Sequence, residues 1–197
     1  MINEKLNGFT IKSLISEEGG MAKVYLAENA IGKRAAVKVL RPKFFWDEPV
    51  KQRFINEAKT MVKLEHEHIC SVYDLVVTDN YAAILLEFME GDDLSVLLEK
   101  NGSLSEEEVI KYLPQICSAL AFAHQKNVVH RDIKPSNLFL HNGKIKLMDF
   151  GIAKVKSEAG GRLTQTGTRM GSISYMSPEQ IRSTKDVDLR TDIYSLG

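Results

Sequence analysis

Residues 128–140 read VVHRDIKPSNLFL, so a short polar segment stands between two apolar ones. Its side chains combine acid, base and amide groups within eight positions: His130, Arg131, Asp132, Lys134 and Asn137. A surface loop needs polar residues for solvation, but it needs no particular order of them. The ordinary alternative is a polar turn with an acidic capping residue. The close interleaving of opposite charges favours a chemical site, and such a site requires partners elsewhere in the chain.

A second motif, MDFG at residues 148–151, begins at the last residue of the strand-like segment KIKLM. It adds the carboxylate of Asp149 to the carboxylate of Asp132 and the amide of Asn137. The spacing of Asp132 and Asn137 fits the pattern H-R-D-x-x-x-x-N, and Asp-Phe-Gly follows it in the order found in protein kinases. The sequence thus resembles the eukaryotic-like (Hanks-type) protein kinases, specifically their bacterial serine/threonine branch. The motifs that carry this resemblance extend in the family's order over nearly the whole chain.

The resemblance implies transfer of the ATP γ-phosphate to serine or threonine hydroxyls of proteins. Because the transferred group is anionic and its transition state is loose, catalysis depends on positioning and on cations more than on covalent chemistry. Asp132 would accept or orient the proton of the substrate hydroxyl, and Lys134 would screen the γ-phosphate. Asn137 and Asp149 offer the oxygen ligands that Mg²⁺ prefers, so they would hold Mg²⁺, or Mn²⁺ in its place, on the triphosphate.

A lysine stands in the middle of the apolar strand-like segment AAVKVL. Lys38 would be costly there without an anion, because an ammonium group loses its hydration when it is buried. Glu57 lies beside the apolar face of a predicted helix at residues 48–64 and is the expected partner. In the family, such a pair touches the α- and β-phosphates of ATP. The alternative is a strand lysine that extends to solvent.

The segment ISEEGGMAKVYLAE stands where the family has a glycine-rich loop, G-x-G-x-x-G-x-V, which ends here at Val24. The three glycine positions of this pattern are Glu17, Gly19 and Ala22, so only the second carries glycine. Glycine lets backbone N–H groups approach a phosphate closely. Glu17 also adds negative charge where a polyphosphate would lie. We therefore expect weaker nucleotide binding than in a relative with three glycines.

The segment ILLEFMEGDDL resembles the connection between the two lobes of a kinase. The backbone of Glu87 and Met89 would bond the adenine edge, and Asp93 would reach the ribose. Leu86 would be the gatekeeper residue. Three apolar residues would sandwich the purine: Val24, Ala36 and Phe139. The alternative is a strand that runs into a polar turn, since apolar residues at strand spacing are ordinarily core.

Residues 151–179, which end at the SPE motif, correspond to the activation segment of the family. The segment is long and polar and has few apolar anchors. A phosphorylated threonine would order it by pairing with Arg131. The candidate phosphorylation sites are Thr164 and Thr166, with Thr168 third. The alternative is a solvent loop that is rich in threonine.

Composition places the chain among ordinary globular proteins: of 197 residues, 44% are hydrophobic and 26% are charged. Basic and acidic residues number 26 each, so no net charge favours a nucleic acid or an anionic membrane as partner. The apolar run YAAILL is too short to span a bilayer, and we expect a cytoplasmic chain without a membrane segment. Cys70 and Cys117 lack metal-ligand spacing and are expected to be buried thiols.

Strand-like segments precede helix-like ones along the chain. Five segments predict a mostly antiparallel sheet: FTIKSLI, KVYLAEN, KRAAVKVL, SVYDLVV and YAAILLEF. Ser105 and Glu108 form a capping-box pattern at the start of a long helix. The buried face of this helix would carry Val109, Leu113, Ile116, Leu120 and Ala123. The predicted fold is α+β and two-lobed: residues 1–89 form a nucleotide-binding N-lobe with five strands and one helix, and residues 90–197 form a partial, mainly helical C-lobe.

The last residues, TDIYSLG, resemble the start of the central helix of the kinase C-lobe, where Asp192 bonds the backbone around His130 and Arg131. Several helices follow in the family, so we expect missing C-terminal helices or a partner surface to cover this lobe. Three interpretations remain open. The first is an active kinase, the second is a truncated nucleotide-binding pseudokinase or scaffold without turnover, and the third is a remnant that does not fold.

Overall fold

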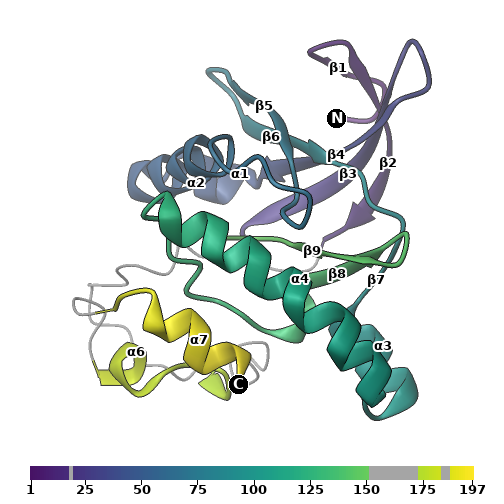
Figure 1. Ribbon diagram of the computed structural model, residues 1–197. Helices are drawn as coiled ribbons and strands as arrows, with labels where there is room; N and C mark the ends of the chain where they lie inside the picture. Colours follow the sequence, from purple (N-terminus) through teal and green to yellow (C-terminus); the bar gives the residue numbers. More distant parts are fainter. Residues whose placement is uncertain (18–19, 151–172, 183–186) are drawn as a thin grey trace. The chain divides into compact units, whose positions relative to one another are not determined.

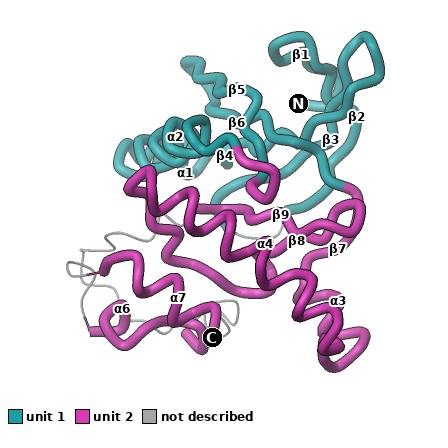
Figure 2. Tube along the Cα trace, in the orientation of Figure 1, with its two compact units in different colours: residues 1–65, 70–89 teal, residues 66–69, 90–197 magenta. Residues whose placement is uncertain are grey.

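The computed structural model describes residues 1–17, 20–150, 173–182 and 187–197. The chain divides into two compact units, shown in different colours in Figure 2. Unit 1 contains residues 1–65 and 70–89, and unit 2 contains residues 66–69 and 90–197.

Unit 1 is built on a six-stranded sheet whose neighbouring strands all run antiparallel, in the order β1-β2-β3-β4-β6-β5 (Figure 1). The strands are β1 (Lys5–Leu6), β2 (Phe9–Ser16), β3 (Ala22–Asn29), β4 (Arg34–Leu40), β5 (Val72–Val77) and β6 (Ala82–Glu87). The five predicted strands are confirmed, but the prediction of a five-stranded sheet is wrong because β1 adds a sixth. β1 has only two residues, which is too short for an alternating pattern to reveal it.

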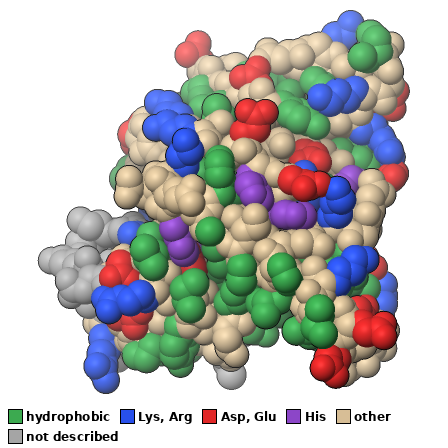
Figure 3. All heavy atoms as spheres, viewed as in Figure 1, with side chains coloured by type: hydrophobic (Ala, Val, Ile, Leu, Met, Phe, Trp, Pro, Cys, Tyr) green, Lys and Arg blue, Asp and Glu red, His purple; other side chains and the backbone are tan. Residues whose placement is uncertain are grey.

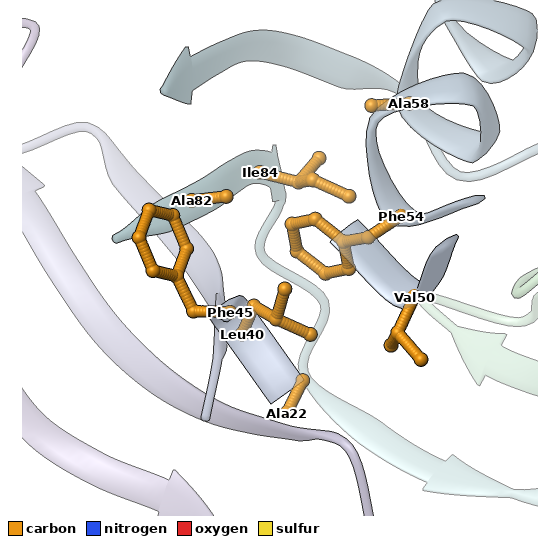
Figure 4. Close-up of a cluster of buried hydrophobic side chains, with 8 residues drawn as sticks. All are labelled: Ala22, Leu40, Phe45, Val50, Phe54, Ala58, Ala82 and Ile84. Carbon is orange, nitrogen blue, oxygen red and sulfur yellow. The ribbon is translucent and has the colours of Figure 1, made fainter. Parts of the chain in front are cut away.

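Two helices accompany this sheet, α1 (Pro42–Phe45) and α2 (Glu48–Met61), so the prediction of one helix is wrong, because the four residues of α1 are too few to show a helical period. The Asp47 carboxylate begins α2 by accepting a hydrogen bond of 3.1 Å from the Val50 N–H. A cluster of buried side chains joins the helices to the sheet (Figure 4): Ala22, Leu40, Phe45, Val50, Phe54, Ala58, Ala82 and Ile84. The predicted helix of residues 48–64 is confirmed, although it ends at Met61. This packing fixes the helix that carries Glu57.

A second cluster of buried side chains contains Leu6, Ile11, Ala27, Val37, Val39, Ala83 and Leu85. Because successive residues of a strand point to opposite faces of the sheet, Val37 and Val39 of β4 lie on one face and Leu40 on the other. Lys38 stands between the two valines and therefore points to the face against which α2 packs.

Unit 2 contains helices and a small three-stranded sheet. Its elements are β7 (Gly91–Asp93), α3 (Leu94–Asn101), α4 (Glu106–Gln125), the 3₁₀ turn η1 (Pro135–Asn137), β8 (Leu138–His141), β9 (Lys144–Leu147), α6 (Pro178–Arg182) and α7 (Arg190–Leu196). The predicted capping box of α4 is confirmed. The Glu108 N–H donates to Ser105 Oγ at 3.2 Å, and the Ser105 N–H donates to Glu108 Oε2 at 2.8 Å.

The buried face of α4 differs from the prediction. The buried residues are Tyr112, Ile116, Ala119, Leu120 and Ala123. Val109 and Leu113 are 43% and 41% exposed, so their predicted burial is wrong. Cys117 is exposed as well, and the prediction of a buried cysteine holds only for Cys70. The helix carries apolar residues on two adjacent stripes, and packing against β9 selects one of them.

Basic and acidic side chains are interspersed on the viewed face in Figure 3, as expected for a formal net charge of zero. Among the helices that the structure describes, none combines the length and the apolar character needed to cross a membrane.

Candidate active site

The Asp132 carboxylate lies at the centre of a group of polar side chains in unit 2. Asn137 Nδ2 donates to Asp132 Oδ2 at 3.1 Å and to the Asp132 backbone carbonyl at 2.7 Å. Lys134 Nζ lies 3.2 Å from the same Oδ2 atom. The Asp132 side chain is 15% exposed, so it is largely shielded but still reachable from solvent. The structure thus brings together three residues that the sequence motif predicts to act jointly.

The backbone just before Asp132 has an unusual conformation. Arg131 has a φ of +66°, in the left-handed region that residues with a side chain rarely occupy. The buried carboxylate of Asp192 on α7 supports it by accepting from the Arg131 N–H at 2.7 Å and from the His130 N–H at 2.8 Å. His124 Nε2 on α4 donates to the same carboxylate at 2.8 Å, and Figure 1 shows α7 beside α4. The hydrogen bonds predicted for Asp192 are confirmed.

His130 is a fully buried imidazole whose two ring nitrogens have different roles. Nε2 lies 2.8 Å from the Met148 carbonyl oxygen, and Nδ1 accepts from the Asp132 N–H at 3.2 Å. A carbonyl oxygen only accepts, so Nε2 carries the ring proton. Burial lowers the pKa of His130 below its ordinary value, and the hydrogen bond to Met148 acts in the opposite direction. The neutral ring therefore links Asp132 to the end of β9.

A backbone hydrogen bond joins Asn137 to the residue that precedes Asp149. The Met148 N–H donates to the Asn137 backbone carbonyl at 2.9 Å, and Asp149 is the next residue. The Asn137 amide nitrogen is engaged with Asp132, which leaves the Asn137 Oδ1 atom as an oxygen ligand. Asp149 has a φ of +48°, also in the left-handed region.

The Asn137 Oδ1 atom and the Asp149 carboxylate suit Mg²⁺ bound together with other ligands better than a metal ion that only protein side chains hold. One amide oxygen and one carboxylate suit Mg²⁺, which usually retains water or phosphate oxygens among its ligands. In the described part of the chain, no group of three or more His, Cys, Asp and Glu side chains has the arrangement of a metal site. Asn137 and Asp149 therefore suit a cation that arrives with phosphate ligands.

In unit 1, the predicted ion pair between Lys38 and Glu57 is present. Lys38 Nζ on β4 lies 3.4 Å from Glu57 Oε1 on α2. The two side chains are 20% and 9% exposed, so each charge offsets part of the hydration that the other has lost. The pair places one ammonium group at a defined position on the sheet face.

Glu17 has partners that the sequence analysis missed. Lys23 Nζ lies 2.7 Å from Glu17 Oε1, and the Arg41 guanidinium donates to the Glu17 backbone carbonyl. The hydrogen bond from Lys23, together with its positive charge, lowers the pKa of Glu17. The negative charge of Glu17 is therefore offset by the positive charge of Lys23. The available signal in the sequence is Lys23 itself, a cation six residues after Glu17.

The other residues predicted to bind nucleotide in unit 1 lie on or next to strands. Ala22 and Val24 belong to β3, and Ala36 belongs to β4. Val24 is the register partner of Lys38, and Ala36 is the register partner of Leu86. Ala36 is therefore directly opposite the predicted gatekeeper.

Glu87 is the last residue of β6, and Met89 follows two residues later. In unit 2, Asp93 of β7 and Phe139 of β8 are register partners. Asp93 Oδ1 also caps α3, because it accepts from the Ser95 N–H at 2.8 Å. Only the second carboxylate oxygen of Asp93 is then available for the predicted ribose contact.

Four predicted site residues lie outside the described residues: Gly19, Thr164, Thr166 and Thr168. Arg131, the predicted partner of a phosphorylated threonine, is described. Its Nε atom is buried, and among the residues that the structure describes it has no hydrogen-bond partner. A buried guanidinium nitrogen in this state is suited to an anion.

Comparison with known proteins gives consistent results. Residues 12–197 match the protein kinase domain family. Serine/threonine-protein kinase PrkC of Bacillus subtilis is 43% identical over 184 residues, which cover 91% of this chain and 28% of PrkC. PknA of Corynebacterium glutamicum, also named a serine/threonine-protein kinase, is 40% identical over 186 residues, covering 91% of this chain and 39% of PknA. The chain thus spans well under half the length of these relatives.

Among solved structures, the kinase domain of Mycobacterium tuberculosis PknI matches with a TM-score of 0.75 and 29% sequence identity. The match covers 100% of this chain and 72% of the PknI chain. The predicted α+β fold of the protein kinase type is confirmed by these comparisons.

Proposed function

Because the chain belongs to the protein kinase family, we propose that it transfers the γ-phosphate of ATP to serine and threonine hydroxyls of protein substrates. The observation that carries this proposal is the contact of Asp132 with Lys134 and Asn137. A carboxylate that accepts a proton, with a cation and an amide directly beside it, is suited to phosphoryl transfer. This set favours turnover over the alternative of a nucleotide-binding scaffold.

Asp132 would orient the substrate hydroxyl and accept its proton. The hydroxyl oxygen forms a bond to the γ-phosphorus, while the bond from that phosphorus to the bridging oxygen breaks and ADP leaves. Lys134 would screen the charge that spreads over the transferred group, because its ammonium lies beside Asp132. Asn137 holds the Asp132 carboxylate by a hydrogen bond and so limits its rotation.

Asn137 Oδ1 and the Asp149 carboxylate would bind Mg²⁺, or Mn²⁺ in its place. Such an ion, when bound, neutralises charge on the phosphates of ATP. The Asn137 amide nitrogen is already used by Asp132, which sets the direction of Oδ1. The same side chain thus serves both the proposed base and the proposed metal.

Lys38 would contact the α- and β-phosphates, with Glu57 holding its ammonium in place. The glycine-rich loop would contribute three further positions: Glu17, Gly19 and Ala22. The purine would lie between the apolar side chains of Val24, Ala36 and Phe139. The ribose would lie near the carboxylate of Asp93. Backbone groups of Glu87 and Met89 would bond the adenine edge.

Thr164 and Thr166 are proposed sites of regulatory phosphorylation. Support comes from Arg131, whose buried Nε atom has no hydrogen-bond partner within the described ranges. A phosphate there would supply acceptor oxygens and negative charge to that guanidinium.

The proposed compartment is the cytoplasm, which supplies ATP and keeps thiols reduced. Cys70 and Cys117 are both thiols in the structure, in agreement with this assignment. Proteins that present serine or threonine are the proposed partners. A nucleic acid is not proposed, since the formal net charge of zero offers no general attraction to phosphate backbones.

A metal titration with phosphoamino acid analysis tests this function. With γ-labelled ATP and a generic protein substrate, label should appear on serine or threonine only when Mg²⁺ or Mn²⁺ is present. The Asn137→Ala variant should require about tenfold more metal for half-maximal labelling, because one of two protein ligands is lost. Label on tyrosine, or labelling that does not depend on a divalent metal, would count against the proposal.

A further inference from the structure

The side-chain amide of Gln180 on α6 is bonded at both of its ends. Its Nε2 donates to the Arg131 backbone carbonyl at 2.9 Å, and its Oε1 accepts from the Ser177 N–H at 3.1 Å. The first bond joins residues that are 49 positions apart in sequence. Gln180 thus connects the segment after the SPE motif to the residue that immediately precedes Asp132.

The orientation of this amide follows from its partners. A backbone carbonyl only accepts hydrogen bonds, and a backbone N–H only donates them. Exchanging the oxygen and nitrogen of Gln180 would set two acceptors against each other at Arg131 and two donors at Ser177. The two contacts therefore define which end of the amide faces Arg131.

The peptide group between Arg131 and Asp132 is consequently held on both sides. Its carbonyl oxygen accepts from Gln180, and its N–H donates to His130 Nδ1 at 3.2 Å. The Arg131 φ of +66° is unfavourable for a residue with a side chain and persists only where the surroundings impose it. Asp192 fixes the preceding peptide group by accepting from the Arg131 N–H at 2.7 Å. The Arg131 carbonyl, on the side toward Asp132, needs a donor. The Asp192 carboxylate only accepts hydrogen bonds, and Gln180 supplies this donor.

The start of α6 is itself attached to α7, the helix that carries Asp192. Ser177 Oγ lies 2.6 Å from Thr191 Oγ1, and both residues are fully buried. Ser177 and Gln180 also form the reciprocal contacts of a capping box, since the Gln180 N–H lies 3.4 Å from Ser177 Oγ. The two side chains that bond the backbone of Arg131, Asp192 on α7 and Gln180 on α6, therefore belong to helices that are themselves joined by a hydrogen bond.

We propose that Gln180 is a positioning residue for the phosphoryl transfer inferred above, and the proposal rests on that function. Gln180 holds the peptide group that precedes Asp132, so the carboxylate keeps the direction needed to meet a substrate hydroxyl. Its action passes through the backbone, because its amide donates to the Arg131 carbonyl and accepts from the Ser177 N–H.

The Gln180→Glu variant separates the two roles of the amide. A glutamate keeps the acceptor for the Ser177 N–H, and Ser105 with Glu108 shows that this chain builds a Ser-x-x-Glu capping box on α4. It loses the donor for the Arg131 carbonyl and sets a negatively charged oxygen against it. We expect kcat to fall about tenfold or more, with the KM for ATP changed by less than about twofold, because misplacement of the base affects the transition state rather than nucleotide binding.

Two further variants serve as controls. Ile181→Ala changes a side chain of α6 that is 63% exposed and leaves both contacts of the Gln180 amide in place, so it should keep kcat within about twofold of the unmodified chain. Gln180→Met has a similar length and no hydrogen-bonding group, so it should lose kcat as the glutamate variant does. Amide hydrogen exchange at Asp132 should accelerate in both Gln180 variants and not in Ile181→Ala, if each protein melts cooperatively.

The outcomes are distinguishable. If the unmodified chain transfers no phosphate, the proposed function fails, and hydrogen exchange at Asp132 still decides the role of Gln180. If Gln180→Glu keeps both the kcat and the Asp132 exchange rate of the unmodified chain, the positioning role is wrong. A change confined to the KM for ATP would overturn it as well.

Discussion

Lys38 Nζ and Glu57 Oε1 lie 3.4 Å apart, although the two residues are 19 positions apart in sequence and belong to a strand and a helix. The contact joins a lysine in the middle of an apolar strand to the carboxylate predicted as its partner. The pair holds the ammonium group for which we propose a contact to the phosphates of ATP.

The first prediction concerns this pair. Lys38→Met should lower kcat/KM by about a hundredfold, since one preorganised cation at a phosphate contributes on this scale. Glu57→Gln should have a smaller effect of about tenfold, because the ammonium remains but is held less firmly. Steady-state kinetics with ATP as the varied substrate measure both effects. A Glu57→Gln loss as large as that of Lys38→Met, or no loss in Lys38→Met, would contradict this ranking of the two groups.

The second prediction concerns Glu17 and Lys23. Lys23→Met should raise the dissociation constant of Mg·ATP a few-fold, because the charge of Glu17 is then no longer offset by a cation 2.7 Å away. In a Glu17→Gly background the same change should have little effect, since no negative charge remains to be offset. Isothermal titration of the four proteins in this cycle gives the coupling. Equal effects of Lys23→Met in both backgrounds would contradict the compensation.

A third prediction follows from Asp192. This fully buried carboxylate accepts from the His130 N–H, the Arg131 N–H and His124 Nε2. Asp192→Ala leaves these donors buried without acceptors, so the free energy of unfolding should fall by about 3 kcal/mol or more. Urea unfolding at constant m-value measures the change.

Asp188→Ala is the matched control for this prediction. Asp188 lies just before α7, is exposed, and forms an ion pair with Arg190 at 2.8 Å. An exposed pair contributes little to stability, so this variant should unfold close to the unmodified chain. Similar losses from Asp188→Ala and Asp192→Ala would refute the special role of the buried carboxylate.

The fourth prediction is a pH dependence from His130. Burial lowers the pKa of this imidazole in the folded state, so below the ordinary histidine value the unfolded chain binds a proton that the folded chain does not. The contribution of His130 to stability is therefore fully present above that value and decreases as the pH falls through and below it. Urea unfolding at a series of pH values should show a shallower decline in His130→Gln than in the unmodified chain. Parallel curves for the two proteins would disprove this contribution.

Local spacing predicts the candidate site well where a motif is short. Asp132 and Asn137 are five positions apart, so their contact follows from the turn η1 that joins them. The same holds for the capping box of Ser105 and Glu108. In such cases the sequence separation alone limits the geometry, and the residue types then specify the hydrogen bonds.

Contacts set by packing between distant segments escape such reasoning. The bond from Gln180 to Arg131 depends on how α6 attaches to α7, which no local pattern reveals. The buried stripe of α4 was predicted with Val109 and Leu113, because the sequence does not show which of two apolar stripes β9 covers. The pairing of Glu17 with Lys23 is not predicted, because a separation of six residues matches neither a helical nor a strand period.

The central claim is that Asp132 acts as the base in transfer of the ATP γ-phosphate, and the most direct measurement compares the unmodified chain with Asp132→Asn. Both proteins are incubated with Mg·ATP and a generic serine/threonine substrate, and the initial rate of γ-phosphate incorporation is measured. Asparagine is nearly isosteric but accepts no proton, so the rate should fall by about a hundredfold or more while ATP binding is retained. Equal rates in the two proteins, or no transfer by the unmodified chain, would contradict the claim.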